Sequence, residues 1–323
     1  MPELPEVETT VRGLRSIVVG KKILDVWTDL ATKDKRQSGN IANPKFFPKF
    51  RKEIKNKKIL SVERRAKNIL INLSGNRTIL IHMKMTGHLL YGAYSKLKVS
   101  AIGGSASGGK SGKLKVEKWE PRDKGPLQDP YNRFLHVVFT LSNGKHLAFS
   151  DARKFGKITL IDRKTAHDTK HLNNIGPEPL DKKFTLEKFK KALAKRPNGK
   201  IKSVLMDQSV IAGIGNIYSD EVLWRAGVRP ERRVATLLRQ GSVGREIKRI
   251  FKAMKTVLSK GIDFGGDSMS DYRNLLGRPG KFQEHHKVYQ LTGEKCQKRG
   301  CRGIIKRVMI NGRSAHFCSA HQK

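Results

Sequence analysis

The first residues of the chain bring an amine and several carboxyl groups together. The sequence opens MPELPEVET. Removal of Met1 would leave Pro2 with a free secondary amine, which titrates near pH ~7.7–8.0 and is therefore partly uncharged and nucleophilic at neutral pH. Glu3 is a candidate general acid or base beside that amine, and Glu6 follows one helical turn later. A proline-stiffened, acidic helix start without a catalytic role has the same sequence, so the motif needs support from the rest of the chain.

The C-terminal tail carries a candidate metal site. The three cysteines, Cys296, Cys301 and Cys318, all lie near the end of the chain, and His321 follows the last of them. Two pairs of soft ligands, one on each side of a short hairpin, are what a tetrahedral structural zinc ion requires. His316 is the alternative fourth ligand, and three free thiols in a basic tail are the alternative to a metal. Since a hairpin this small has almost no core, we expect zinc to supply its folding free energy.

Two further segments are candidates for phosphate contacts. Arg64-Arg65-Ala66-Lys67 lies where one predicted strand ends and the next begins. Lys67 projects either into a site, where it pairs with a phosphate or assists proton transfer, or along a charged strand edge. Gly213 and Gly215 allow a tight turn into a predicted helix that starts near Asn216. Backbone N–H groups that face outward at such a helix start form a cradle for an anion such as a DNA phosphate.

Two polar loops each present a large apolar side chain. His82 ends a predicted strand and Met85 follows at the loop tip, while Arg153 and Phe155 share a second loop. An unbranched Met or an exposed Phe can fill the gap that an extruded base leaves in a duplex, with Arg as its hydrogen-bonding neighbour. Half-buried packing of the Met and the Phe is the commoner arrangement, and the residues alone leave both open.

The charge of the chain indicates a polyanionic partner. The 323 residues carry 67 Lys and Arg against 28 Asp and Glu, a formal net charge of +39. This excess favours a nucleic acid, with anionic membrane or ribosomal RNA as the competing partners. No segment reaches the ~20 apolar residues of a membrane span, and an odd number of cysteines at one end argues against a secreted disulfide scaffold. We therefore expect a soluble, intracellular protein.

Three structural units are expected to position these candidates. Residues 1–175 predict a catalytic N-terminal domain, with a helix over residues 2–18 and then a β-sandwich. Within it, residues 95–130 are rich in Lys, Gly and Ser without a period, which predicts a mobile basic loop. Residues 176–285 predict an all-α domain, and residues 286–323 a small β-hairpin. Strands are expected at residues 22–30, 59–64, 68–73, 78–83, 134–141, 145–150 and 156–161, and further helices at 186–194, 201–207, 217–226 and 243–260.

Together these motifs resemble the formamidopyrimidine-DNA glycosylases, the Fpg or MutM branch of the Fpg/Nei family. They occur in the family's order: PELPEVETT at 2–10, RRAK at 64–67, IHMKMTG at 81–87, DARKFG at 151–156, GPEPL at 176–180, GIGNIYSDE at 213–221 and the cysteine-bearing hairpin. The resemblance runs almost end to end. It implies an α+β multidomain fold made of an N-terminal helix plus β-sandwich, a helix–two-turn–helix domain and a zinc finger, with double-stranded DNA between the halves.

The same resemblance implies a bifunctional DNA glycosylase and DNA-(apurinic or apyrimidinic site) lyase of base excision repair, which removes oxidised purines such as 8-oxoguanine and formamidopyrimidines. Pro2 would attack C1′ and form a Schiff base that leads to β,δ-elimination. The catalytic residues would be Pro2, Glu3, Glu6 and Lys67. The DNA contacts would come from His82, Met85, Arg153, Phe155, Asn216 and Arg313. One structural Zn²⁺ would be held by Cys296, Cys301, Cys318 and His321.

The chain departs from the family pattern in several places. Four residues rather than two separate the first cysteine pair, His321 replaces the last cysteine, and Lys154 stands where a second arginine is common. Gly265–Lys281 corresponds to the region that folds over the flipped base, but no single residue can be matched there. The expected preference for oxidised purines therefore rests on the N-terminal motif and on the residues that fill the gap in the duplex.

Two other functions stay open. A Nei-like glycosylase for oxidised pyrimidines would usually open with PEGPE and lack the Arg–Phe pair. A non-catalytic zinc-finger DNA-binding protein of the same fold is less compatible with an intact Pro2, Glu3 and Lys67. We expect a monomer that acts on DNA containing oxidised bases, in the bacterial cytoplasm and associated with the nucleoid.

Overall fold

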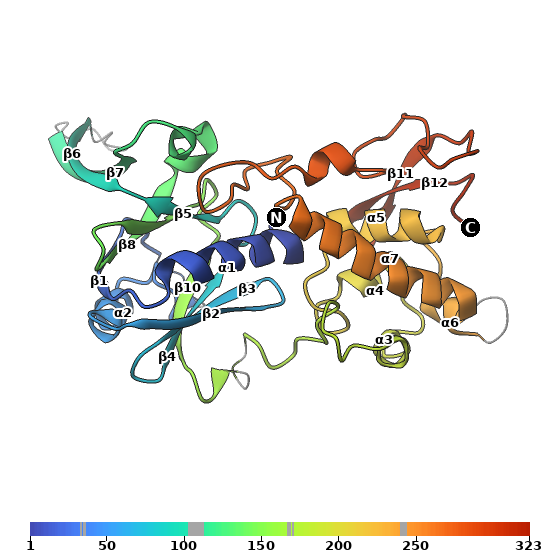
Figure 1. The fold of residues 1–323 in the computed structure, drawn as a ribbon, viewed down its shortest axis with the longest axis horizontal. Helices are drawn as coiled ribbons and strands as arrows, with labels where there is room; N and C mark the ends of the chain where they lie inside the picture. Colours follow the sequence, from blue (N-terminus) through green and yellow to red (C-terminus); the bar gives the residue numbers. More distant parts are fainter. Residues whose placement is uncertain (33, 35–36, 103–112, 167–168, 170, 240–243) are drawn as a thin grey trace.

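The structure is a computed structural model that describes all residues except 33, 35–36, 103–112, 167–168, 170 and 240–243. Figure 1 shows a sheet-rich half that contains the first strands and a helix-rich half that contains most of the later helices. The N-terminus lies at the junction of the two halves. The expected α+β architecture is confirmed, while the domain boundaries at 175/176 and 285/286 stay a prediction.

Two antiparallel four-stranded sheets form the first half. Their strand orders are β1-β8-β9-β5 and β10-β4-β3-β2. The strands are β1 (Ile23–Thr28), β2 (Ile59–Arg65), β3 (Asn68–Leu73), β4 (Arg77–His82), β5 (His88–Gly92), β8 (Leu135–Leu141), β9 (His146–Ser150) and β10 (Lys157–Asp162). Seven of the eight match predicted strands; β5 and the short helix α2 (Phe47–Ile54) were not predicted. Apolar side chains from both sheets share one buried core, which is the sandwich that the alternating pattern predicts.

Helix α1 (Leu4–Val18) joins the cores of the two halves. Val7, Val11 and Leu14 are buried in the sandwich core, whereas Leu4 is buried in the core of the helical half. The Leu4 amide also donates to the Gly213 carbonyl over 2.9 Å. A Cβ at residue 213, where φ is +86°, would lie 2.7 Å from the Leu4 Cβ, so this close approach requires glycine.

The second half is helical, as predicted. Its helices are α3 (Leu186–Leu193), α4 (Ile201–Met206), α5 (Asn216–Ala226), α6 (Val234–Leu238) and α7 (Gly244–Asp263). Only α6 was not predicted, and residue 243, the expected start of the last helix, lies outside the described residues. After α7 the chain runs over the sandwich and then forms the C-terminal hairpin (Figure 1). None of the helices in the described part of the chain is long and apolar enough to cross a membrane.

The prediction of a loop without regular structure over residues 95–130 is wrong for the described residues. β6 (Tyr94–Ile102) and β7 (Lys113–Pro121) pair antiparallel, followed by the 3-10 turns η2 (Pro126–Gln128) and η3 (Pro130–Arg133). The base of this hairpin is anchored because the Trp119 ring packs against Trp27, at 6.2 Å between ring centroids, and against His146, at 5.0 Å. The composition of this region, rich in Lys, Gly and Ser, shows no strand period, so the hairpin was not predicted. Its stability comes from these long-range aromatic contacts.

The C-terminal hairpin forms as its turn sequence predicts. β11 (Ile305–Ile310) pairs with β12 (Arg313–Cys318). The two turn residues, Asn311 and Gly312, have φ of 47° and 74°. A two-residue hairpin loop with positive φ at both positions favours Asn-Gly, so this local signal was sufficient.

Candidate active site and metal centre

The Glu3 carboxylate caps the start of α5. Its Oε2 accepts a hydrogen bond from the Gly215 amide over 2.5 Å, and its Oε1 accepts from the Ile217 amide over 2.9 Å. A Cβ at residue 215 would lie 2.4 Å from the Glu3 Cδ, so only glycine allows this approach. The expectation that the amides around Asn216 face outward to bind a DNA phosphate is therefore wrong for these two, because an internal carboxylate takes their hydrogen bonds.

Glu6 connects the start of α1 to two parts of the helical half, helix α5 and the segment after α7. Its Oε2 accepts from the Glu3 amide over 2.7 Å, and its Oε1 accepts from the Tyr218 hydroxyl and the Asp267 amide, both over 2.7 Å. Burial, reinforced by the charge of Glu3, raises the pKa of Glu6 to about 7. A carboxyl group at this position exchanges a proton near neutral pH.

Glu3 and Lys67 are two buried titratable groups of the site. Burial raises the pKa of Glu3, and the charges of Lys67 and of the chain's amino terminus oppose this shift. Burial likewise lowers the pKa of Lys67, and the charges of Glu3 and Glu6 oppose that shift. The charges of the two groups therefore act on each other, and Pro2, which precedes Glu3, is also buried.

Lys67 is held at the tight turn between β2 and β3, where Ala66 has a positive φ of 52°. The Lys67 side chain is 5% exposed and lines a cavity of about 470 Å³, together with His82, Lys84 and Lys157. Three lysines on one cavity make a strongly positive surface. The alternative of a solvated strand edge does not describe Lys67.

The two arginines before Lys67 have a structural role. The Glu178 carboxylate accepts from Arg64 over 2.6 Å, from Arg65 over 3.0 Å and from the Ala66 amide over 2.6 Å. Arg64 also donates to Glu8 over 2.8 Å. Glu178 therefore fixes the turn that carries Lys67, and it ties this turn to the segment that leads into the helical half.

His82 is a neutral hydrogen-bonding group. Its Nδ1 accepts from the Lys84 amide over 3.0 Å, which leaves Nε2–H as a donor. Burial lowers the pKa of His82 to about 3, with further contributions from the charges of Lys84 and Lys67. His82 is therefore uncharged at physiological pH.

The Met85 and Phe155 loops are adjacent because Asp151 holds them together. Asp151 accepts from the Thr86 hydroxyl, and also from the Gly156 amide over 2.7 Å. On the outside of the second loop, the Arg153 guanidinium lies over the Phe155 ring at 4.7 Å, and Phe155 is 51% exposed. Met85 is half-buried. The loop pair thus presents a cation and an aromatic ring to solvent, an arrangement that suits insertion into a base stack.

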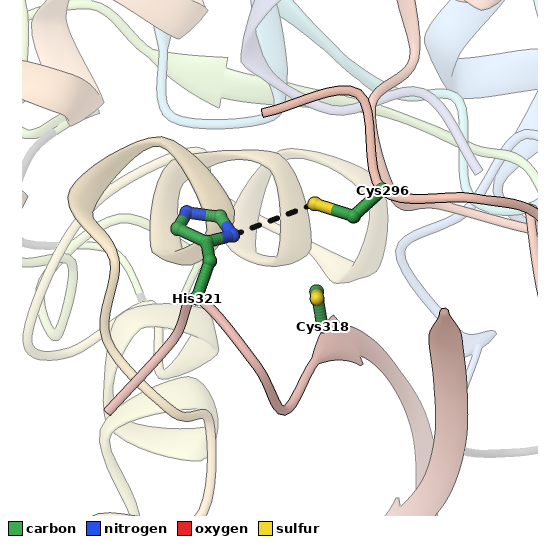
Figure 2. Close-up of side chains that lie close together, drawn as sticks. All are labelled: Cys296, Cys318 and His321. Carbon is green, nitrogen blue, oxygen red and sulfur yellow. Dashed lines mark hydrogen bonds between the residues drawn. The ribbon is translucent and has the colours of Figure 1, made fainter. Parts of the chain in front are cut away.

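Cys296, Cys318 and His321 form a cluster that can hold a metal ion. Their ligand atoms all lie within 4.8 Å of one another, and Figure 2 shows these side chains converging from the two ends of the hairpin segment. Cys296 Sγ lies 3.6 Å from His321 Nδ1. Cys301 Sγ lies 3.7 Å from Cys318 Sγ, so the fourth predicted ligand lies next to this cluster.

The imidazole of His321 is oriented for a metal ligand. Its Nε2 lies 2.9 Å from the Trp224 carbonyl, so Nε2–H donates there and Nδ1 is left facing the thiols. The Trp224 indole in turn donates to Cys296 Sγ over 3.4 Å. His316, the alternative ligand, instead places Nδ1 3.0 Å from a carboxylate oxygen of Asp220. The donor set therefore favours His321 over His316.

Asn216 and Arg313 lie at the ends of elements that pack together. Asn216 is the first residue of α5, and Arg313, which is exposed, is the first residue of β12. The Asp220 carboxylate of α5 accepts from the His316 amide of β12 over 3.0 Å and from Lys202 over 2.5 Å. This buried contact fixes the hairpin against the helix that carries Asn216.

Residue-type reasoning missed four positioning residues, Asp151, Glu178, Tyr218 and Asp267. Each makes hydrogen bonds to site residues far away in sequence. All four lie in segments that the sequence analysis names: DARKFG, GPEPL, GIGNIYSDE and residues 265–281. A motif in one sequence does not reveal which of its side chains are turned towards the rest of the protein. Polar residues close to the glycines of these segments were the signal that the sequence offered.

Comparisons with known proteins agree with this geometry. Residues 1–158 match the formamidopyrimidine-DNA glycosylase N-terminal domain, and residues 175–273 match the formamidopyrimidine-DNA glycosylase H2TH domain. The formamidopyrimidine-DNA glycosylase of Pelotomaculum thermopropionicum is 37% identical, over 100% of this chain and 99% of that protein. The corresponding protein of a Bradyrhizobium species is 36% identical over the full length of both.

Solved structures give the same result. Lactococcus lactis Fpg bound to DNA with an abasic site is similar with a TM-score of 0.76, at 29% identity over 99% of both chains. MutM in complex with DNA that contains carbocyclic 8-oxo-G is similar with a TM-score of 0.75, at 30% identity over 100% of both chains. The chain belongs to the formamidopyrimidine-DNA glycosylase family.

Proposed function

We propose that this protein is a bifunctional DNA glycosylase and abasic-site lyase of base excision repair, which removes oxidised purines from double-stranded DNA. The observation that carries the proposal is the cluster of the buried groups Glu3, Glu6 and Lys67, whose charges act on one another next to the chain's amino terminus. The net charge of +39 supports a partner with a phosphate backbone and a place on the nucleoid. Family relatives whose structures hold an abasic site or 8-oxo-G support the substrate class.

In the proposed reaction, removal of Met1 frees the Pro2 nitrogen. Its lone pair attacks C1′ of the damaged nucleotide, the bond from C1′ to the base breaks, and the base leaves with the proton that the amine gives up. The bond from C1′ to O4′ then breaks and O4′ takes up a proton, which leaves an iminium between C1′ and the Pro2 nitrogen. This iminium acidifies the C2′ hydrogens, so loss of a C2′ proton expels the 3′ phosphate, and a second elimination expels the 5′ phosphate. Glu3 exchanges these protons, because burial raises its pKa and two backbone amides fix its orientation.

The remaining site residues bind and distort the DNA. Lys67 and the neutral His82 hold phosphate near the lesion, and Asn216 and Arg313 hold phosphates on its flanks. Met85, Arg153 and Phe155 fill the space left by the extruded nucleotide, with Arg153 towards the unpaired cytosine. Extrusion costs ~a few kcal/mol, and these contacts offset that cost.

We further propose one structural Zn²⁺ bound by Cys296, Cys301, Cys318 and His321. Two cysteines and an oriented imidazole of the cluster, with Cys301 3.7 Å from Cys318, supply the four ligands that its tetrahedral preference requires. When bound, the ion supplies folding free energy to the hairpin and leaves no position open for substrate, so its effect on catalysis is confined to holding Arg313 in place.

The decisive test uses duplexes with 8-oxoguanine opposite each of the four bases. Incision is scored on gels, and the Schiff base is trapped covalently with borohydride. We expect incision with β,δ-elimination products, trapping by the native protein and no trapping by Pro2→Gly. Pro44→Gly, at an exposed loop residue, is the matched control and should trap like the native protein. Incision of oxidised pyrimidines alone would favour a Nei-like enzyme, and DNA binding without trapping would favour a non-catalytic protein.

A further inference from the structure

Residues 265–281, between α7 and η5 (Phe282–His285), form a wall beside the catalytic carboxylates. The Asp267 amide donates to Glu6 Oε1 over 2.7 Å, and the Tyr272 hydroxyl donates to the Glu6 carbonyl over 3.1 Å. A Cβ at residue 266 would lie 2.9 Å from the Glu6 Cγ. The segment therefore meets Glu6 through the backbone of residues 266 and 267 and through the Tyr272 hydroxyl, so its backbone must be held in place for these contacts to form.

The crest of this segment, residues 268–271, is partly exposed next to the site. Met269 is 47% exposed and Ser270 is also exposed, whereas Tyr272 and Arg273 immediately after them are buried. The Ser268 end of the crest is already held, because its hydroxyl donates to the Tyr272 carbonyl over 2.7 Å and its amide donates to the Gln283 side chain over 3.0 Å. The exposed residues Met269 and Ser270 must be fixed from the other end as well.

Arg273 fixes the crest from the C-terminal side. Its guanidinium donates to the Ser270 carbonyl over 3.1 Å and to the Tyr272 carbonyl over 2.9 Å. The same group pairs with Asp129 of the sandwich half, Nε to Oδ2 at 3.0 Å, and lies 4.4 Å from the centroid of the Tyr131 ring. One planar cation thus binds the crest backbone and the sandwich half at once.

A second set of contacts seats the following residues on the sandwich. The Asn132 amide donates to the Gly277 carbonyl over 3.2 Å and to the Pro126 carbonyl over 2.9 Å, while its oxygen lies 2.9 Å from His88 Nε2. The Tyr91 amide donates to the Leu275 carbonyl over 2.8 Å. These contacts already hold residues 274–278 on the sandwich. The Asp129–Arg273 pair in addition fixes the backbone of the crest.

We propose that Arg273, anchored by Asp129, is a positioning residue that holds the crest, residues 268–271, against a damaged base in the site. This inference rests on the proposed glycosylase function. An intact base must be retained outside the duplex against restacking, which is worth a few kcal/mol, whereas an abasic site has no base to retain. The anchor therefore matters for base removal and not for cleavage at an abasic site.

The test compares two substrates in the full-length protein: a duplex with 8-oxoguanine and a duplex with an abasic site. For Arg273→Met and the milder Asp129→Asn, we expect kcat/KM for 8-oxoguanine excision to fall about 10-fold or more, because misplaced contact groups cost that much. Cleavage and borohydride trapping at the abasic site should stay within about 2-fold, which also reports that the variants are folded.

Arg51→Met is the matched control. Arg51 pairs with Asp25 through two bonds of 2.6 and 2.7 Å on the surface of the sandwich, and both activities should be unchanged. Equal loss of both activities in the Arg273 and Asp129 variants would reduce the pair to a general structural role and overturn the inference, as would no loss at all. Failure of the native protein to cut either duplex would instead overturn the proposed function.

Discussion

The carboxylate site and the Met85–Phe155 loop pair are built in opposite ways. Glu3 and Glu6 are 2% exposed, and backbone amides from two other segments hold their oxygens. Arg153 and Phe155 lie on the surface and stack on each other. The reacting groups are thus oriented before DNA arrives, whereas the loop residues gain their main contacts only in a complex.

This difference has an energetic consequence. Orienting the carboxylates in advance removes a reorganisation cost from the chemical step, but it places two acids in a buried position that disfavours their charged forms. An exposed Arg–Phe pair contributes little to folding and remains available for stacking against bases. Changes at the first site should therefore affect stability and activity together, and changes at the second should affect activity alone.

The largest expected effect comes from Glu3→Gln. The amide would place an N–H group against a backbone N–H of α5, leaving a buried donor unsatisfied at a cost of about 1–3 kcal/mol. Loss of proton exchange should lower single-turnover excision by about 10²- to 10⁴-fold. Thermal unfolding and excision are measured on the same samples, with Glu187→Gln on the exposed face of α3 as control. Full stability in Glu3→Gln would contradict the capping role.

Metal removal should act on binding and leave the carboxylate site alone. Treatment with a chelator is expected to unfold the hairpin around Cys296 and Cys318, because the metal supplies its folding free energy. DNA affinity should fall by about 100-fold as Arg313 loses its position, since a desolvated charged contact is worth a few kcal/mol. Fluorescence of Trp224, which contacts Cys296, reports the local change, and added zinc should reverse it. An unchanged affinity would contradict the zinc proposal.

The pH dependence of stability should identify Glu6. Its pKa is about 7 in the folded chain against an ordinary 4.5, so between these values the folded state holds a proton that the unfolded state has released. The Glu6 contribution is therefore fully present below pH 4.5 and is lost as pH rises through 7. Between pH 5 and pH 8, the free energy of unfolding should fall about 2 kcal/mol more in the native protein than in Glu6→Gln. Equal pH profiles would contradict the burial argument.

The smallest effect is expected at the exposed loop. Phe155→Ala should lower excision opposite cytosine by about 10-fold, in line with the loss of one aromatic stacking contact. Its free energy of unfolding should change by less than about 0.5 kcal/mol, because the ring is half exposed. Denaturant titration checks stability, and gel assays check excision. A destabilised Phe155→Ala would remove the contrast between the two regions.

Local patterns predicted much of the fold. Alternating strands, the helix spacing after residue 180 and the Asn311-Gly312 turn all depend on neighbours in sequence, and all three were found. The β6–β7 hairpin was missed because its stability depends on Trp119 meeting Trp27 across the fold. The short helix α2, FPKFRKEI, has too few turns to show a clear period.

The sequence predicted the residue types of the candidate site but not the hydrogen bonds that connect them. The N-terminal motif, Lys67 and the cysteine pairs carry their chemistry in the sequence itself. That Glu3 occupies the start of α5, or that Glu178 holds both arginines of the RRAK motif, depends on contacts more than a hundred residues apart. Such pairings leave no periodic signal in one sequence.

The placement of Leu4 in one core and Val7 in the other has a mechanical consequence. A single helical turn connects the cores of the two halves. Neither half can therefore rotate against the other without shifting residue 2. If the two halves open to admit a duplex, the nucleophilic residue 2 would then move out of its place in the site in the same step. Closure of the halves on a damaged strand would return residue 2 to that place.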